Sequence, residues 1–210
     1  MTILTDIAEG LERGEDDRVG QLVRDALARQ TPALEILNDG LLAGMARVGE
    51  QFRLREIFLP DVLLAARAMY AGLDLLKPLL AQDGMPSAGR VVLGTVKGDL
   101  HDIGKNLVGI MLQGAGFEVI DLGHDVTAER FVDTAQARGA SVIGLSALLT
   151  TTMTGMKDVV DLVRARGLAG RVRVIVGGAP VSESWAREIG ADAYGYDAAN
   201  AVDRVRALVT

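Results

Sequence analysis

The 210-residue chain contains no cysteine, which excludes disulfide bonds, cysteine-ligated zinc and iron–sulfur clusters. It also lacks an excess of basic residues: 22 Lys and Arg against 28 Asp and Glu give a formal net charge of -6, unlike a nucleic-acid-binding surface. No basic segment followed by an apolar run marks a secretory signal, and Asp61, Arg67 and Asp74 interrupt the longest apolar region, residues 57–80. We therefore expect a cytoplasmic protein that binds neither membrane nor nucleic acid.

Apolar residues in the first eighty positions recur three or four apart, as they do on the buried face of a helix. Thr31 and Pro32 fit an N-cap and a first helical residue, and Pro60 fits the start of the next helix. With two shorter stretches at residues 7–11 and 19–27, this pattern predicts a four-helix bundle. The periodic positions are Leu34, Leu37, Leu41, Met45, Val48 and Phe52, then Val62, Ala66, Met69, Leu73, Leu76 and Leu80.

The pattern changes after residues 81–89 (AQDGMPSAG), which have the small and turn-forming residues of a linker. Short aliphatic runs now alternate with helical stretches, as parallel βαβ units require. We therefore predict an α/β protein, with a helical cap domain at residues 1–88 and a doubly wound, flavodoxin-like or Rossmann-like domain at residues 89–210. The expected strands are residues 91–96, 117–122, 142–145, 172–176 and 191–194.

The segment that carries chemistry follows the first expected strand, at residues 97–106 (KGDLHDIGKN). Ligands of doubly wound domains bind beyond the carboxyl ends of the strands, so a site is expected here. His101 is one of two histidines in the chain, and Asp99 lies two residues before it. A carboxylate that binds one ring nitrogen fixes the tautomer and leaves the other nitrogen free for a metal.

Spacing alone leaves other interpretations of this segment open. A histidine beside two aspartates also fits a solvated polar turn. Gly98 and Gly104 flank a helix start, as in a phosphate-binding loop, although the full dinucleotide glycine fingerprint is missing. His101 and His124 could ligate zinc, but the sequence offers no third ligand at close spacing.

A resemblance to a known family selects among these interpretations. Asp99-x-His101-x-x-Gly104 is followed, after forty-one intervening residues, by Ser146-x-Leu148 and later by Gly177-Gly178. This order resembles the signature of the base-off/His-on cobalamin-binding proteins, which include methionine synthase, B12-dependent mutases and corrinoid proteins of methyltransferase systems. The first half is similar to the helical cap of methionine synthase and of the stand-alone corrinoid proteins, and mutases generally lack that cap. The cap motifs are Met45-x-x-Val48-Gly49-x-x-Phe52 and Ile57-Phe58-Leu59-Pro60.

The resemblance implies a role for each matching residue. His101 would be the lower axial ligand of cobalt in place of the cofactor's dimethylbenzimidazole, and Asp99 would accept the other ring N–H. Thr152 stands where methionine synthase has a serine, and its hydroxyl would complete a hydrogen-bonded relay of His101, Asp99 and Thr152. Ser146 and Thr150 would contact the nucleotide tail, and glycines at 177 and 178 would leave room for it. Further cofactor-binding positions are Gly98, Leu100, Asp102, Gly104, Leu148 and Ala198.

On the upper face of the corrinoid, Phe52 and Leu59 would shield the methyl–cobalt bond, although both also continue an apolar helical pattern and could simply pack in the core. Asn38 falls where methionine synthase has a cofactor-contacting glutamate. His124 matches no ligand of the family and is expected to be a polar residue that closes the second strand.

The function implied by the resemblance is that of a methyl carrier, whose cobalamin cycles between Co(I) and methyl-Co(III). The chain itself would be non-catalytic. A substrate-specific methyltransferase would supply the methyl group from a methylamine, methanol, an aryl methyl ether or a similar donor. A second methyltransferase would pass it to tetrahydrofolate or a thiol, and a reductive activase would restore oxidised cobalt. The cap would move on the linker at residues 81–89. The alternatives are a cobalamin-dependent regulator or light sensor, and a flavodoxin-like module that binds no corrinoid.

Overall fold

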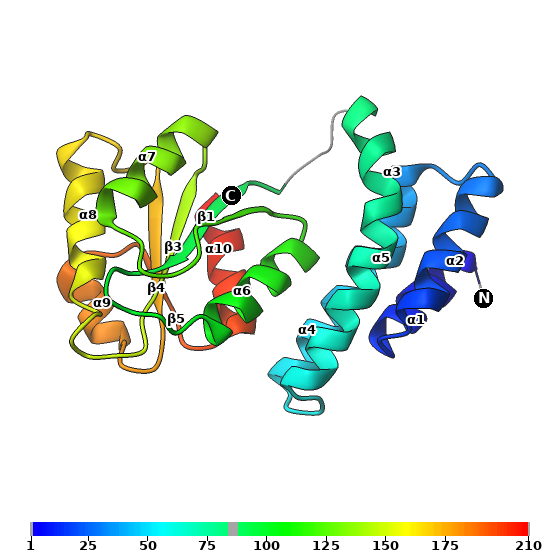
Figure 1. Cartoon of the computed structure of the whole chain (residues 1–210), viewed down its shortest axis with the longest axis horizontal. Coiled ribbons are helices and arrows are strands. Elements are labelled where there is room, and N and C mark those ends of the chain that lie inside the picture. The colour runs from blue at the N-terminus through cyan, green and yellow to red at the C-terminus, as the bar shows by residue number, and fades with distance from the viewer. Residues whose placement is uncertain (1, 84–87, 210) are drawn as a thin grey trace. The chain divides into compact units, whose positions relative to one another are not determined.

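The computed structural model describes residues 2–83 and 88–209 and divides the chain into two compact units, Met1–Pro86 and Ser87–Thr210 (Figure 1). The boundary expected from the sequence lies between residues 88 and 89. Residues 81–83 of the expected linker are the end of helix α5 (Leu59–Asp83), and residues 84–87 lie outside the described part of the chain. The hinge therefore remains a prediction, and each unit is considered separately below.

The first unit is entirely helical in its described residues, as the apolar periodicity predicted. One helix begins a residue later than expected, because Pro32 has an extended ψ of 136° and is itself the N-cap. Gly44 lets two helices meet closely, since a Cβ there would lie 2.9 Å from the carbonyl oxygen of Ala8. The elements are α1 (Ile3–Glu12), α2 (Asp16–Ala28), α3 (Ala33–Glu35), the π-helix η1 (Ile36–Leu42), α4 (Ala43–Arg53) and α5.

The second unit contains a five-stranded parallel sheet in the order β2-β1-β3-β4-β5, which confirms the predicted α/β fold. Its strands are β1 (Arg90–Thr95), β2 (Glu118–Asp121), β3 (Val142–Ser146), β4 (Arg173–Gly177) and β5 (Ala193–Gly195). Its helices are α6 (Ile103–Gly114), α7 (Ala128–Arg138), α8 (Gly155–Ala165), α9 (Glu183–Ile189) and α10 (Ala198–Val209).

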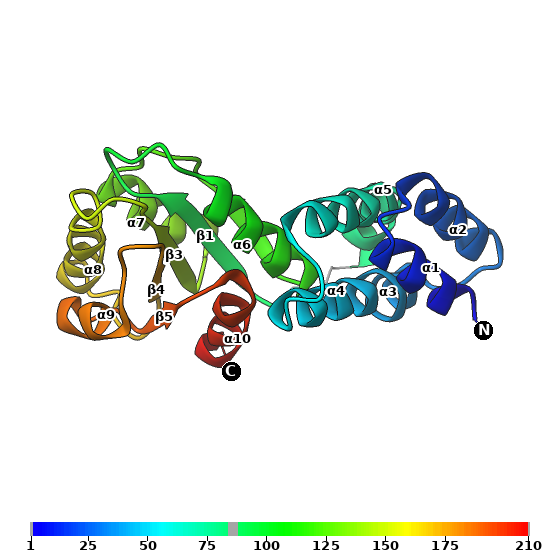
Figure 2. The same cartoon turned by 90° about the horizontal axis from the view of Figure 1, so that it is seen from below.

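Helices cover both faces of this sheet, with α6 and α10 on one side and α7, α8 and α9 on the other (Figures 1 and 2). The central strands are consequently buried on both faces, which explains why their sequences are apolar at successive positions instead of alternating with polar residues. At Gly94 a side chain is excluded, because a Cβ would lie 2.7 Å from the ring of Phe131, a buried residue of α7. No helix in the described ranges is long and apolar enough to cross a membrane.

The sheet order places a topological switch point between β1 and β3. The chain leaves β1 toward α6 on one face, whereas it leaves β3 toward α8 on the other. The two strands pair in parallel up to Thr95 and Ser146, so the loops that follow them begin side by side. A crevice at the carboxyl ends of such strands is the usual ligand site of this architecture.

Candidate functional site

The loop after β1 holds Asp99 and His101 in a compact, hydrogen-bonded conformation. The N–H of Asp99 donates to the carbonyl of Val96 (3.1 Å) and closes a turn in which Gly98 has a φ of +81°. The hydroxyl of Thr95, fully buried at the end of β1, donates to the carbonyl of His101 (3.0 Å). The strand end thus fixes the backbone on both sides of Asp99.

One carboxylate oxygen of Asp99 faces His101. It lies 2.7 Å from the ring nitrogen Nδ1 and accepts a further bond from the His101 backbone N–H (3.1 Å). An ionised carboxylate can only accept hydrogen bonds, so Nδ1 carries the proton and Nε2 of the neutral ring keeps its lone pair. The Asp99 side chain is fully buried, whereas that of His101 is 52% exposed. Nε2 is therefore oriented and available as a ligand.

The second carboxylate oxygen of Asp99 reaches the loop after β3. It accepts hydrogen bonds from the Thr152 hydroxyl (2.7 Å) and from the backbone N–H groups of Leu148 (2.8 Å) and Leu149 (3.3 Å). The structure thus brings together the three residues of the predicted relay. The backbone donors were not predicted, because side-chain identity carries no signal for a backbone bond.

These partners decide the ionisation of Asp99. Burial by itself raises the pKa of a carboxyl group, because it disfavours the charged form. Here the hydrogen bonds from Leu148, Thr152 and His101 outweigh burial and hold the pKa of Asp99 well below its usual range. The carboxylate is consequently ionised throughout the neutral pH range and remains an acceptor for the Nδ1 proton.

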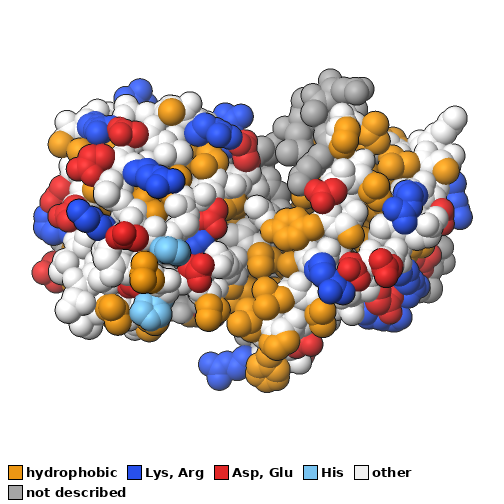
Figure 3. Space-filling model, in the orientation of Figure 1, with side chains coloured by type: hydrophobic (Ala, Val, Ile, Leu, Met, Phe, Trp, Pro, Cys, Tyr) orange, Lys and Arg blue, Asp and Glu red, His pale blue; other side chains and the backbone are white. Residues whose placement is uncertain are grey.

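Exposed apolar side chains belong to the two loops that meet at His101 and Asp99. Leu100 and Ile103 are 66% and 71% exposed, and Leu148 and Leu149 on the neighbouring loop are also exposed. Figure 3 shows hydrophobic side chains beside both histidine side chains on the surface of this unit. At Gly104 a Cβ would meet no atom of the chain within 4 Å, so glycine at this position leaves open space above the start of α6. An apolar face around one free imidazole nitrogen fits a large planar cofactor such as a corrin.

Glycine is required by the chain itself at the last residue of β4 and at the residue that follows it. A Cβ on Gly178, where φ is +124°, would lie 1.9 Å from the carbonyl oxygen of Ala147, and a Cβ on Gly177 would lie 2.9 Å from that of Gly195. Glycine therefore allows the ends of β3, β4 and β5 to approach closely. The expected contact of these glycines with a nucleotide tail remains a prediction.

The other predicted cofactor-binding residues lie around the same strand ends. Ser146 is half-buried at the end of β3, and Thr150 is exposed in the following loop. Asp102 is the N-cap of α6 but makes no side-chain capping bond, and Ala198 is the buried first residue of α10. Their contacts with the cofactor remain predictions.

The residues predicted for the upper face belong to the first unit. Phe52 lies near the end of α4 and Leu59 begins α5, and both are half-buried. Asn38 is exposed on η1. The shielding role of the first two therefore remains a prediction.

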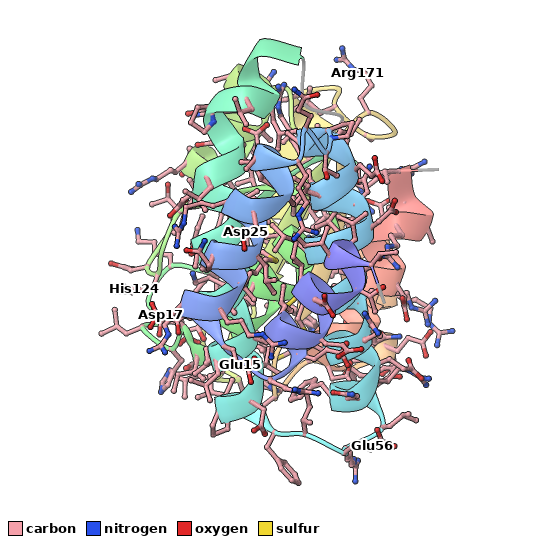
Figure 4. All side chains as sticks on the ribbon, turned by 90° about the vertical axis from the view of Figure 1, so that its right-hand side faces the viewer. Glu15, Asp17, Asp25, Glu56, His124 and Arg171 are labelled. Carbon is pink, nitrogen blue, oxygen red and sulfur yellow. The ribbon has the colours of Figure 1, made fainter. Side chains whose placement is uncertain are left out.

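His124 does not close the second strand. Strand β2 ends at Asp121, and His124 lies three residues later in an exposed loop, where it projects outward (Figure 4). Within the described ranges no three His, Asp or Glu side chains gather as a metal-binding group. A metal that is held mainly by a macrocycle needs only one protein ligand.

Thr152→Val should lower the free energy of unfolding of the cofactor-free protein by about 1–2 kcal/mol, because a buried carboxylate loses a hydroxyl donor at constant side-chain volume. The hydroxyl also lies 3.0 Å from the carbonyl of Leu149, but the ionised Asp99 is the closer and stronger acceptor. Urea titration measures the change. Thr151→Val, at an exposed neighbouring position, is the matched control, and Thr152→Ser should retain most of the stability. Equal losses in both valine variants would contradict the assignment.

Two family models match the chain, and each is described as a B12 binding domain. One matches residues 89–203 and the other residues 3–77. Among curated proteins, a corrinoid protein of Desulfitobacterium hafniense is 43% identical over 97% of this chain and 95% of its own length. A dimethylamine corrinoid protein of Methanosarcina barkeri is 44% identical over 99% of this chain and 97% of its own length.

The solved structures that this chain resembles also come from cobalamin proteins. The crystal structure of the methanol:cobalamin methyltransferase complex of Methanosarcina barkeri contains a chain with a TM-score of 0.89 and 31% identity, which covers 99% of this chain and 79% of that chain. A cobalamin-binding protein of Desulfitobacterium hafniense has a TM-score of 0.79 and 34% identity, and the match covers 99% and 98% of the two chains.

Proposed function

Because the chain belongs to the family of B12-binding corrinoid proteins, we propose that it carries a methyl group on a cobalamin that His101 ligates through Nε2. The observation that carries this proposal is the buried Asp99 carboxylate, whose oxygens bind Nδ1 of His101 on one side and Thr152 on the other. When bound, the corrinoid supplies a cobalt centre that accepts and donates the methyl group.

The protein's own residues prepare the ligand for this chemistry. Asp99 keeps the proton on Nδ1, so Nε2 remains the ring atom that exchanges between metal and solvent. Thr152 and the backbone N–H groups of Leu148 and Leu149 stabilise the negative charge of Asp99 by donating hydrogen bonds to it. Leu100, on the same loop, and Ile103, at the start of α6, offer exposed apolar surface that a bound corrinoid would cover. These residues orient the ligand, and the transfer reactions require partner enzymes.

The names of the relatives support a proposal about the partners. Similar proteins are named for dimethylamine and trimethylamine, and one similar structure belongs to a complex that acts on methanol. We therefore place the donor among small methylated compounds of this kind, with a substrate-specific methyltransferase that delivers the methyl group. A second methyltransferase would transfer it to tetrahydrofolate or a thiol, and a reductive activase would restore oxidised cobalt.

Histidine labelling tests the ligation. The cofactor-free protein is loaded with hydroxocobalamin, reduced to the Co(II) state and studied by electron paramagnetic resonance, with and without nitrogen-15 histidine. We expect the axial nitrogen splitting to change from triplets to doublets on labelling, because the ligand is a histidine of the protein. Failure to take up the corrinoid, or a splitting that ignores the label, would contradict the proposal.

A panel of donors tests methyl transfer. The loaded protein is reduced to the Co(I) state and mixed with candidate methyltransferases and with dimethylamine, trimethylamine or methanol, and methylation of the cobalt is followed by absorbance. We expect methylation only with a donor and its matching enzyme. Methylation by the loaded protein alone would contradict its role as a carrier.

A further inference from the structure

The geometry points to Asp125 as a positioning residue that holds the loop of Asp99 and His101 in the conformation in which His101 would ligate cobalt. Asp125 lies in the loop between β2 and α7, outside the cofactor-binding motif, and is exposed. Its effect on ligation rests on the proposed function, whereas its contacts with the loop are visible in the protein without cofactor.

The first contact is made by the side chain. The turn from Val96 to Asp99 has glycine with positive φ at its third position, as in a type II turn, and this turn does not use the N–H of Gly98. The carboxylate oxygen Oδ1 of Asp125 accepts that N–H at 2.7 Å. A glycine rotates freely because it has no side chain. The carboxylate therefore fixes the one peptide unit of the turn that has the greatest freedom.

The second contact is made by the backbone. The N–H of Asp125 donates to the carbonyl of Asp99 (3.1 Å), so Asp125 holds the backbone on both sides of the Asp99 side chain. Asp125 has a φ of +54°, in the left-handed region that aspartate, asparagine and glycine tolerate best. This conformation lets one residue present its side chain and its own N–H to the same turn.

The loop that carries Asp125 is itself anchored to β1. The N–H of Thr95 donates to the carbonyl of Gly123 (3.0 Å), and the N–H of Val126 donates to the carbonyl of Thr95 (3.0 Å). Both bonds are made within two residues of Asp125, so its position is fixed relative to the strand end. We infer that Asp125 transfers the rigidity of the sheet to the loop and keeps Oδ1 of Asp99 within reach of His101.

Two substitutions of Asp125 distinguish the contribution of its side-chain hydrogen bond from that of its backbone hydrogen bond. Asp125→Gly removes the carboxylate and still adopts the left-handed conformation, so the fold should remain intact. Asp125→Asn keeps a side-chain oxygen that can accept the Gly98 N–H. The matched control is Asp192→Ala, because Asp192 also accepts a backbone N–H, that of Val174 (2.8 Å), but at the opposite end of the sheet.

Hydrogen exchange of the Gly98 amide, followed by NMR in the cofactor-free protein, measures the contact directly. We expect exchange at least about tenfold faster in Asp125→Gly and near the wild-type rate in Asp125→Asn. In the loaded protein, the ratio of histidine-ligated to unligated cobalt should fall by about tenfold in Asp125→Gly and recover in Asp125→Asn. Asp192→Ala should change neither quantity.

Unchanged ligation in a folded Asp125→Gly protein would overturn the inference while leaving the proposed function intact. An equal loss of ligation in Asp192→Ala would also overturn it, because the effect would then reflect general destabilisation. If the wild-type protein itself shows no histidine nitrogen on cobalt, the proposed function fails together with this inference. The wild-type spectrum thus distinguishes the two failures.

Discussion

Asp99→Asn is expected to abolish ligation of cobalt by His101. The asparagine oxygen would face Leu148 and Leu149, whose backbone N–H groups can only donate, and its NH₂ group would then face Nδ1 of His101. Nδ1 must accept that hydrogen bond, so the proton of the neutral ring moves to Nε2. The nitrogen that should bind cobalt loses its lone pair, and histidine-dependent splitting should disappear from the spectrum of the loaded protein.

The same substitution should lower the free energy of unfolding of the cofactor-free protein by about 3 kcal/mol, because several hydrogen bonds lose a buried charged acceptor. Urea titration gives the value. Asp158→Asn, an exposed carboxylate in the first turn of α8, is the control and should change stability by less than about 0.5 kcal/mol. A folded Asp99→Asn protein with wild-type histidine ligation would show that the carboxylate does not select the tautomer.

His101→Ala should still take up the corrinoid but lose the axial histidine nitrogen. The side chain is half exposed, and its removal leaves the bonds of Asp99 to Leu148 and Thr152 in place, so the fold should be nearly as stable as the wild type. The histidine label should then have no effect on the splitting. Added imidazole should partly restore a nitrogen ligand, because it can enter the space that the side chain leaves.

The second histidine provides the matched control for this experiment. His124 is exposed on the neighbouring loop, and no family motif gives it a role. His124→Ala should therefore retain the label-dependent splitting of the wild type. If the two alanine variants gave the opposite result, His124 would be the ligand and the assignment of His101 would be wrong.

The fold was predictable where one physical signal dominated. Strands β1 and β3 are buried on both faces, so short apolar runs without polar alternation identified them to within a residue. The helices of the first unit followed from apolar periodicity. The π-helix η1 could not be predicted, because two apolar residues four positions apart, such as Leu37 and Leu41, fit one face of an α-helix as well as one face of a π-helix. Strand β5 is only three residues long, and such a short pairing is set by its neighbour β4.

The candidate site was predictable in its side chains but not in its backbone bonds. Asp99 and His101 are close in sequence, so the expected pair could be located directly, and the family resemblance added Thr152. The remaining contacts join the loop after β1 to loops that are distant in sequence, so they depend on the tertiary arrangement of these loops. They are the hydrogen bonds from Leu148 and Leu149 and the two contacts of Asp125. The closeness of Gly178 to Ala147 depends on the same meeting, so a reason for glycine within the chain emerged only from the structure.

The crowding at Gly178 has a mechanical consequence for the metal ligand. The carbonyl of Ala147 lies against Gly178, and the N–H of the next residue, Leu148, holds Asp99. Even one methyl group at position 178 would push the end of β3 aside and pull that amide away from the carboxylate. The backbone at Gly178 thus sets the position of the Leu148 amide and, through Asp99, that of the His101 ring. A substitution at Gly178 would therefore weaken ligation although this residue does not touch the imidazole.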